Sequence, residues 1–190
     1  MAEVLLFHHA QGLTDGVIAF ADELRGAGHT VHTPDLFDGR TFESIDAGMA
    51  YIEEQGFEAL ADRGIKLADV LPAELVYAGF SFGVVPAQKL AQTRPGARGA
   101  LLFYAFVPLE YVGPWPYGLR GQVHGMDRDP IFAGEGDLEA ARAVVEQTPT
   151  LELFLYPGDQ HYFADRSLSS YDPVAADLLT RRVLDFLSAV

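Results

Sequence analysis

The 190-residue chain contains no cysteine. Disulfide bonds, thiolate metal sites and a cysteine nucleophile are therefore all excluded. The sequence also lacks any apolar run close to the about 18 residues that a membrane-spanning helix needs. It starts with Met1-Ala2-Glu3-Val4, an acidic start without the basic segment and long apolar run of a signal peptide. These absences favour a cytoplasmic location.

Positive charge is scarce as well. The chain has 13 Lys and Arg residues against 27 Asp and Glu residues, which gives a formal net charge of −14. Phosphate backbones and anionic membranes bind to concentrated positive charge, and no basic cluster is present. We therefore expect no nucleic-acid partner and no membrane partner, and we interpret the acidic surface as a source of solubility. No pattern indicates an oligomeric state.

Short apolar runs alternate with amphipathic helix patterns along the whole chain. The runs lie at 4–7, 75–78, 100–104, 122–124 and 151–156, with a weaker one around Val31. Most are continuously apolar, as is typical of parallel strands that are covered on both faces. The alternation predicts one α/β domain over residues 1–190, with a mostly parallel, doubly wound sheet and helices on both faces. Ligands of such sheets bind beyond the carboxyl ends of the strands, so catalytic residues should directly follow strands.

Helix boundaries are marked by capping residues. Thr14 is a plausible N-cap for an apolar stripe at Val17, Phe20, Ala21 and Leu24. Asp172 followed by Pro173 predicts the start of the last helix. A further helix pattern follows Asp137, and we interpret Glu43 and the helix patterns of residues 43–70 as structural.

The strongest motif is Gly79-Phe80-Ser81-Phe82-Gly83, a G-x-S-x-G sequence between an apolar run and a helix pattern. This context is the one that a nucleophile elbow requires. The turn is tight enough to need glycine on both sides, and it exposes the serine oxygen above a helix N-terminus, where the Phe82 N–H points at a developing oxyanion. The alternative is an ordinary turn in which Ser81 only caps the helix.

A serine hydroxyl needs a base, and histidine suits this role at neutral pH. In the chain order Ser–acid–His only His124 and His161 qualify. His124 lies inside a predicted strand and is interpreted as a core residue. His161 follows the last strand and a Pro157-Gly158 turn, so it is the favoured base; the alternative is a histidine of a surface loop.

Two aspartates follow the predicted strand at 122–124, and either is a candidate for the acid that orients the histidine. Asp127 could instead pair with Arg128 or cap the turn. Asp129 precedes Pro130, whose ring favours an extended backbone that aims the side chain away from the turn, so Asp129 is preferred. Asp159 is a third candidate, more typical of a turn.

In their order and spacing these segments resemble the dienelactone hydrolase family of α/β-hydrolases. The resemblance covers nearly the whole chain: His8-His9-Ala10-Gln11-Gly12-Leu13-Thr14, the elbow, the stretch from Gly125 to Asp129, and Tyr156-Pro157-Gly158 leading to His161-Tyr162-Phe163-Ala164. It implies the α/β-hydrolase fold and hydrolysis of an ester or lactone. It also supports Asp129 as the acid, and it suggests the backbone N–H of Ala10 as the second oxyanion donor.

Three positions differ from the family pattern. The nucleophile is Ser81 and not cysteine, His9 occupies the position of a glutamate, and Asp165 occupies that of a substrate-binding arginine. Because an aspartate would repel a carboxylate, we expect a substrate other than dienelactone. His9 is expected to tune Ser81, and His8 to line the entrance. A zinc site at this pair is not expected, since neighbouring strand residues point to opposite faces.

The segment from Tyr104 to Gly121 has no helix or strand periodicity and is rich in aromatic residues and proline. Because it follows a strand, we expect it to overhang the site. Phe106 and Trp115 would then form part of an apolar wall of the substrate pocket, and His9 and Gln11 are expected to line the same pocket. The alternative is a loop that only covers the edge of the sheet.

Together these features predict a serine hydrolase with the triad Ser81, His161 and Asp129, an oxyanion hole from Phe82 and Ala10, and a small ester or lactone as substrate. No cofactor and no metal are expected. A thioesterase or amidase would use the same triad, and a catalytically silent ligand-binding protein would share the fold.

Overall fold

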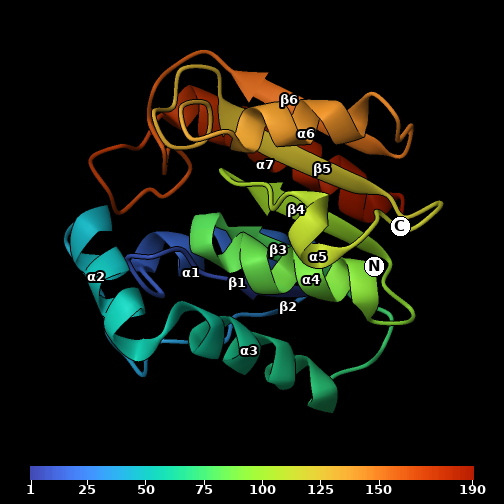
Figure 1. Cartoon of the computed structure of the whole chain (residues 1–190), viewed down its shortest axis with the longest axis horizontal. Coiled ribbons are helices and arrows are strands. Elements are labelled where there is room, and N and C mark those ends of the chain that lie inside the picture. Colours follow the sequence, from blue (N-terminus) through green and yellow to red (C-terminus); the bar gives the residue numbers. More distant parts are fainter.

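Six parallel strands form a single sheet in the order β2-β1-β3-β4-β5-β6 (Figure 1). The computed structural model describes all residues, 1–190. The strands are β1 (Glu3–Phe7), β2 (Thr30–His32), β3 (Val76–Phe80), β4 (Gly99–Phe103), β5 (Gly121–Met126) and β6 (Leu151–Tyr156). Every neighbouring pair runs parallel. The α/β class and the parallel sheet expected from the apolar runs are confirmed.

Helices cover both faces of the sheet. On one face lie α1 (Asp15–Gly26) and α7 (Pro173–Ser188); on the other lie α3 (Phe57–Leu67), α4 (Val84–Thr93) and α6 (Asp137–Val145). Each face of the sheet has its own hydrophobic core: the first core lies under α1 and α7, and the second lies under α3, α4 and α6. Along β1, Val4 and Leu6 point into the first core, and Leu5 and Phe7 point into the second. This alternation explains why the strands read as unbroken apolar runs, because both sets of side chains are buried.

The remaining helices are short or lie near the rim. They are α2 (Ile45–Gln55), α5 (Leu109–Val112) and the 3₁₀ turns η1 (Ala68–Val70) and η2 (Ser81–Gly83). The segment between β4 and β5 therefore contains a single helical turn that the lack of periodicity did not predict. None of the helices combines the length and apolar character that crossing a membrane would require.

The predicted caps are present. The Thr14 hydroxyl oxygen accepts a hydrogen bond from the Val17 N–H at 3.3 Å. The Asp172 carboxylate accepts two, from the N–H groups of Val174 and Ala175, each at 3.0 Å. Each cap satisfies backbone donors that the first turn leaves free, a contribution of about 1 kcal/mol.

The chain reverses direction across the sheet at β1, which has β2 on one side and β3 on the other. Such a switch point opens a crevice at the carboxyl ends of the two strands beside it, here β1 and β3. The segment after β1 starts at His8, and the segment after β3 starts at Ser81. The two most distinctive motifs of the sequence thus meet at this edge, on the left in Figure 1.

Candidate active site

Ser81 occupies a strained turn between β3 and α4. Its φ angle is +49°, in the left-handed region that residues other than glycine rarely adopt. The neighbouring glycines are required by space. A Cβ at Gly79 would collide with the backbone of Gly83, and a Cβ at Gly83 would lie 2.6 Å from the carbonyl oxygens of Phe7 and His8. The turn therefore has the geometry of the predicted nucleophile elbow.

Ser81, His161 and Asp129 form a continuous chain of hydrogen bonds, although they lie far apart in the sequence. The Ser81 hydroxyl is 2.9 Å from Nε2 of His161. On the other side of the ring, Nδ1 is 2.6 Å from Oδ2 of Asp129. Because a carboxylate only accepts, Nδ1 carries the proton and Nε2 is the acceptor for the serine O–H.

Asp129 is held in place by a second contact. The residue is 1% exposed, and Oδ1 accepts a hydrogen bond from the Ile131 N–H at 2.9 Å. Both carboxylate oxygens are therefore used, one to fix the aspartate and the other to fix the imidazole. This arrangement holds the histidine in one tautomer and one orientation.

The other candidate acids and the other candidate base lie elsewhere. Asp127 is exposed and accepts from the Gly158 N–H at 3.0 Å, which ties two rim turns together; it does not pair with Arg128. Asp159 is exposed and accepts from its neighbour Gln160. His124 is fully buried between Tyr156 and Gln122, and burial lowers its pKa to about 3. The structure thus places only Asp129 against His161.

The two residues predicted to supply the oxyanion donors lie on the segments that follow β3 and β1. Phe82 is the residue after Ser81, in η2 at the start of α4. Ala10 lies on the segment after β1 and is 1% exposed, and its N–H makes no hydrogen bond within the chain. A buried backbone N–H without a partner is rare and costs free energy. A donor left free next to a nucleophile is what an oxyanion hole requires.

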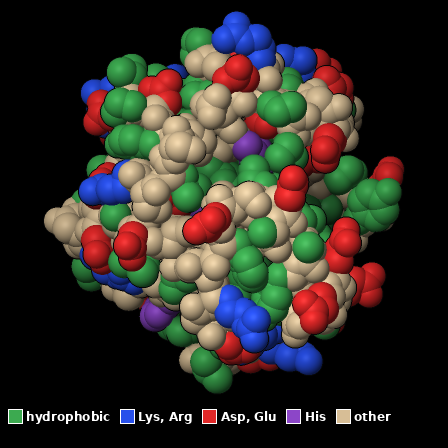
Figure 2. Space-filling view, turned by 90° about the vertical axis from the view of Figure 1, so that its left-hand side faces the viewer, with side chains coloured by type: hydrophobic (Ala, Val, Ile, Leu, Met, Phe, Trp, Pro, Cys, Tyr) green, Lys and Arg blue, Asp and Glu red, His purple; other side chains and the backbone are tan.

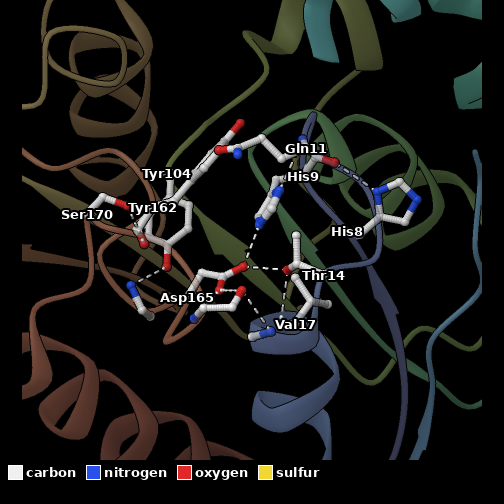
Figure 3. A network of polar contacts seen from close by, with 12 residues as sticks. His8, His9, Gln11, Thr14, Val17, Tyr104, Tyr162, Asp165 and Ser170 are labelled. Atoms are coloured by element: carbon white, nitrogen blue, oxygen red, sulfur yellow. Dashed lines mark hydrogen bonds and ion pairs between the residues drawn. The ribbon is translucent and has the colours of Figure 1, made fainter. Parts of the chain in front are cut away.

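His9 belongs to a buried polar network with Asp165 and Thr14 (Figure 3). Its Nε2 donates to Oδ2 of Asp165 at 2.9 Å, and its Nδ1 accepts from the Gln11 N–H at 3.2 Å. Thr14 also donates to Oδ2 of Asp165, at 2.5 Å. Burial lowers the pKa of His9, with the nearby Asp165 acting in the opposite direction, so the ring is neutral at pH 7.

This network corrects two expectations. The ring nitrogens of His9 are both occupied by partners other than Ser81, so His9 is neither a direct contact of the nucleophile nor part of the cleft lining. Asp165 is buried beside His9 and does not face a substrate, so it repels no carboxylate there. Burial acts to raise the pKa of Asp165, but hydrogen bonds from His9, Ser167 and Thr14 outweigh it and lower the pKa.

His8 is a structural residue. It is fully buried, Nδ1 donates to the His9 carbonyl at 2.8 Å, and Nε2 accepts from the Leu36 N–H at 3.0 Å. Burial lowers its pKa to about 4. The expectation that His8 lines the entrance is therefore wrong, because both of its nitrogens anchor backbone. No group of three or more potential ligands could hold a metal ion.

A cleft of about 620 Å³ opens beside His161. Most of the residues that line it are of polar type, and none is Lys or Arg; the residues are Gln11, Glu43, Ser44, Ile45, Pro130, Ile131, Asp159, Gln160, His161, Tyr162 and Ser167–Ser170. Gln11 lies in this lining as expected, and its amide donates to the Phe42 carbonyl at 2.8 Å. Glu43, interpreted from the sequence as structural, also lies in the cleft. Figure 2 shows this side of the molecule, with a histidine visible near the centre among hydrophobic and other uncharged groups, and with acidic side chains farther out on the same face.

Phe106 and Trp115 do not line this cleft, contrary to expectation. Phe106 is fully buried in the second core, and Trp115 packs against it and lies over Gly121, the first residue of β5. A crossover from the carboxyl end of one parallel strand must return to the opposite edge of the sheet before the next strand begins. Only the first residues of this segment can therefore lie near the catalytic rim.

Tyr162 is the site residue that the sequence reasoning missed. It is 1% exposed and lines the cleft, with its ring stacked on His9 at 4.2 Å between centroids and next to His161 at 4.7 Å. Burial raises the pKa of its hydroxyl to about 12. The available signal was its position directly after the candidate base.

The chain is similar to known proteins in both sequence and fold. A family model described as dienelactone hydrolase family matches residues 1–190. A protein of Saccharolobus solfataricus, provisionally named carboxymethylenebutenolidase, is 32% identical over 138 residues, which make up 72% of this chain and 49% of that protein. The match thus spans about half of the relative's length.

Solved structures share the fold at low sequence identity. A dienelactone hydrolase-like promiscuous phosphotriesterase from metagenomic libraries has a TM-score of 0.74 at 17% identity, covering 100% of this chain and 86% of that one. A protein of Xanthomonas campestris, provisionally described as a hydrolase of the α/β superfamily, has a TM-score of 0.68 at 19% identity, covering 100% of both chains. The fold is therefore that of the α/β-hydrolases.

Proposed function

The chain belongs to the dienelactone hydrolase family, and from this premise we propose that it is a serine hydrolase that cleaves a small carboxylic ester or lactone through an acyl-enzyme intermediate. The observation that carries the proposal is the pair of hydrogen bonds that links Ser81 to His161 at 2.9 Å and His161 to Asp129 at 2.6 Å. These distances suit proton transfer without rearrangement.

In the first step Oγ of Ser81 attacks the ester carbonyl carbon while Nε2 of His161 takes the hydroxyl proton. The imidazolium that forms is stabilised by Asp129. The carbonyl oxygen becomes an oxyanion, and the N–H groups of Phe82 and Ala10 donate to it. Collapse of this intermediate breaks the bond to the leaving oxygen, which receives its proton from His161.

In the second step water takes the place of Ser81 as the nucleophile. His161 removes a proton from the water as it attacks the acyl-serine carbonyl, and Ser81 leaves with the proton restored. The products are a carboxylic acid and an alcohol, or one hydroxy acid if the substrate is a lactone. No further reactant is needed for atoms and charges to balance.

The cleft favours uncharged or polar substrates. Its lining contains Glu43 and Asp159 but no Lys or Arg. A carboxylate-bearing substrate would therefore lose its hydration without gaining an ionic partner. The hydroxyl and amide groups of the lining are suited to hydrogen bonding with neutral esters or lactones.

Labelling with a fluorophosphonate followed by intact mass measurement tests the proposal. We expect one adduct in the wild-type protein, mapped to Ser81, and none in Ser81→Ala. Ser188→Ala removes an exposed serine on α7 and should label like the wild type. A wild-type protein that neither labels nor hydrolyses p-nitrophenyl acetate would refute the proposal and leave a ligand-binding role. Parallel assays on thioester and amide analogues separate esterase from thioesterase or amidase activity.

A further inference from the structure

The hydroxyl of Tyr162 has no hydrogen-bond partner, although its side chain is buried. Such groups are uncommon in native proteins, because a phenol that leaves water without a new partner costs folding free energy. The other buried tyrosine of this region satisfies the rule, since the Tyr104 hydroxyl accepts from the Ala164 N–H at 3.1 Å. The free hydroxyl of Tyr162 therefore needs an explanation.

The surroundings of this hydroxyl are the groups of the proposed reaction. Burial is the largest influence on its pKa and raises it; the Ser81 hydroxyl and the Ala10 N–H are the next largest, and both act to lower the pKa. Neither contact has the geometry of a hydrogen bond. The phenol is protonated at neutral pH and lies with the unpartnered N–H of Ala10 beside the nucleophile. The Tyr162 hydroxyl and the Ala10 N–H are thus two donors near Ser81 for which no protein acceptor of ordinary geometry is available.

We propose that the Tyr162 hydroxyl is a third oxyanion donor, which hydrogen-bonds the ester carbonyl oxygen as that oxygen gains negative charge. The inference rests on the proposed function, since it assigns a further residue to the same reaction. The tyrosine keeps its proton throughout. Its bond strengthens as charge develops, so the stabilisation is greater for the transition state than for the bound ester.

The ring of Tyr162 is held by contacts that do not involve the hydroxyl. It stacks on His9 with an interplanar angle of 12°, and Asp165 fixes His9 from behind. Ser170 donates to the Tyr162 carbonyl at 3.3 Å (Figure 3). The donor is thus oriented before substrate arrives, and Tyr162→Phe should remove the hydroxyl while leaving the ring in place.

The test compares Tyr162→Phe with Tyr171→Phe, a matched loss of a partly exposed hydroxyl that lines a different cavity. For p-nitrophenyl acetate we expect Tyr162→Phe to lower kcat by about 10- to 100-fold with little change in KM, since one oxyanion donor is lost. An alkyl trifluoromethyl ketone forms a hemiketal oxyanion on the serine, so its Ki should rise by a similar factor. The melting temperature should stay level or rise. Tyr171→Phe should match the wild type in all these measurements.

Several results would overturn the inference. A Tyr162→Phe enzyme that is faster than the wild type would mean that the hydroxyl blocks the oxyanion hole. Unchanged kcat, or a rise in KM alone with the ketone Ki unaffected, would mean that no hydrogen bond forms in the transition state. These outcomes, in an active wild type that labels at Ser81, leave the proposed function standing. A wild-type protein that neither hydrolyses the ester nor labels at Ser81 would refute both the proposed function and this inference.

Discussion

The proposed triad can be tested by replacing Asp129 and Asp127, the two aspartates of the turn after β5, with asparagine one at a time. Asp129→Asn keeps the size of the side chain and an oxygen that can accept from the Ile131 N–H. It removes the negative charge that faces Nδ1 of His161 at 2.6 Å. The amide nitrogen can also turn toward Nδ1 and donate to it, which would place the imidazole proton on Nε2. In that tautomer His161 cannot accept the proton of Ser81.

The expected magnitude follows from the charge that is lost. Two opposite charges about 4 Å apart interact by about 4 kcal/mol at an effective dielectric constant of about 20. Loss of this stabilisation of the imidazolium corresponds to roughly a thousandfold in rate, and the wrong tautomer extends the loss toward about 10⁴-fold. Because the interaction forms fully only in the transition state, kcat should carry most of the effect.

Asp127→Asn is the matched control, since Asp127 is exposed, lies two residues away and accepts only from the Gly158 N–H. An asparagine oxygen can replace that bond, so turnover should stay within about threefold of the wild type. Steady-state hydrolysis of p-nitrophenyl acetate, with circular dichroism to check folding, measures both variants. Loss of turnover in Asp127→Asn with activity retained in Asp129→Asn would refute the reasoning.

Three further predictions concern stability. Gly83→Ala should lower the free energy of unfolding by about 2 kcal/mol or more, because the new Cβ would collide with backbone oxygens at the end of β1. The control Gly26→Ala, which has open space around it, should be neutral or stabilising. Equal urea midpoints for the two variants would contradict this prediction. Asp165→Asn should cost about 1–3 kcal/mol, because every group bonded to this carboxylate is a donor; an unchanged melting temperature would show that the network is dispensable. His8 and His124 have pKa values lowered to about 4 and about 3, so between these values and about pH 6.5 the unfolded chain binds protons that the folded chain does not. Stability should therefore be full above about pH 6.5 and fall with decreasing pH, by up to about 1.4 kcal/mol per pH unit for each histidine; a flat profile between pH 7.5 and pH 5 in urea titrations would argue against buried neutral rings.

Local patterns predicted the strands and the capped helices because both depend on neighbouring residues. Unbroken apolar runs arise wherever both faces of a strand are covered, and Asp172 with Pro173 starts α7 through bonds that span only three residues. The same holds for the elbow. Gly79 and Gly83, two residues before and after Ser81, are required because the start of α4 approaches β3 and the end of β1 too closely for a Cβ atom.

Partners distant in the sequence were harder to infer. Trp115 was expected over the cleft, but the return path from β4 to β5 carries it to the opposite edge of the sheet. Asp165 was expected to face substrate, whereas the loop after β6 folds it inward onto His9 and Thr14. Both errors came from assigning a direction to a loop side chain, which composition does not encode.

By itself the sequence determined the strand–helix alternation, the elbow at Ser81 and the short set of residues from which a base and an acid could come, because each depends on spacing along the chain. The sequence favoured Asp129 over Asp127, but only the tertiary structure brought Asp129 into contact with His161. It also stacked His9 on the ring of Tyr162 and left the Tyr162 hydroxyl without a hydrogen-bond partner. These outcomes depend on loops from β1, β3, β5 and β6 converging at one edge, where shifts of a few ångströms decide which side chains touch.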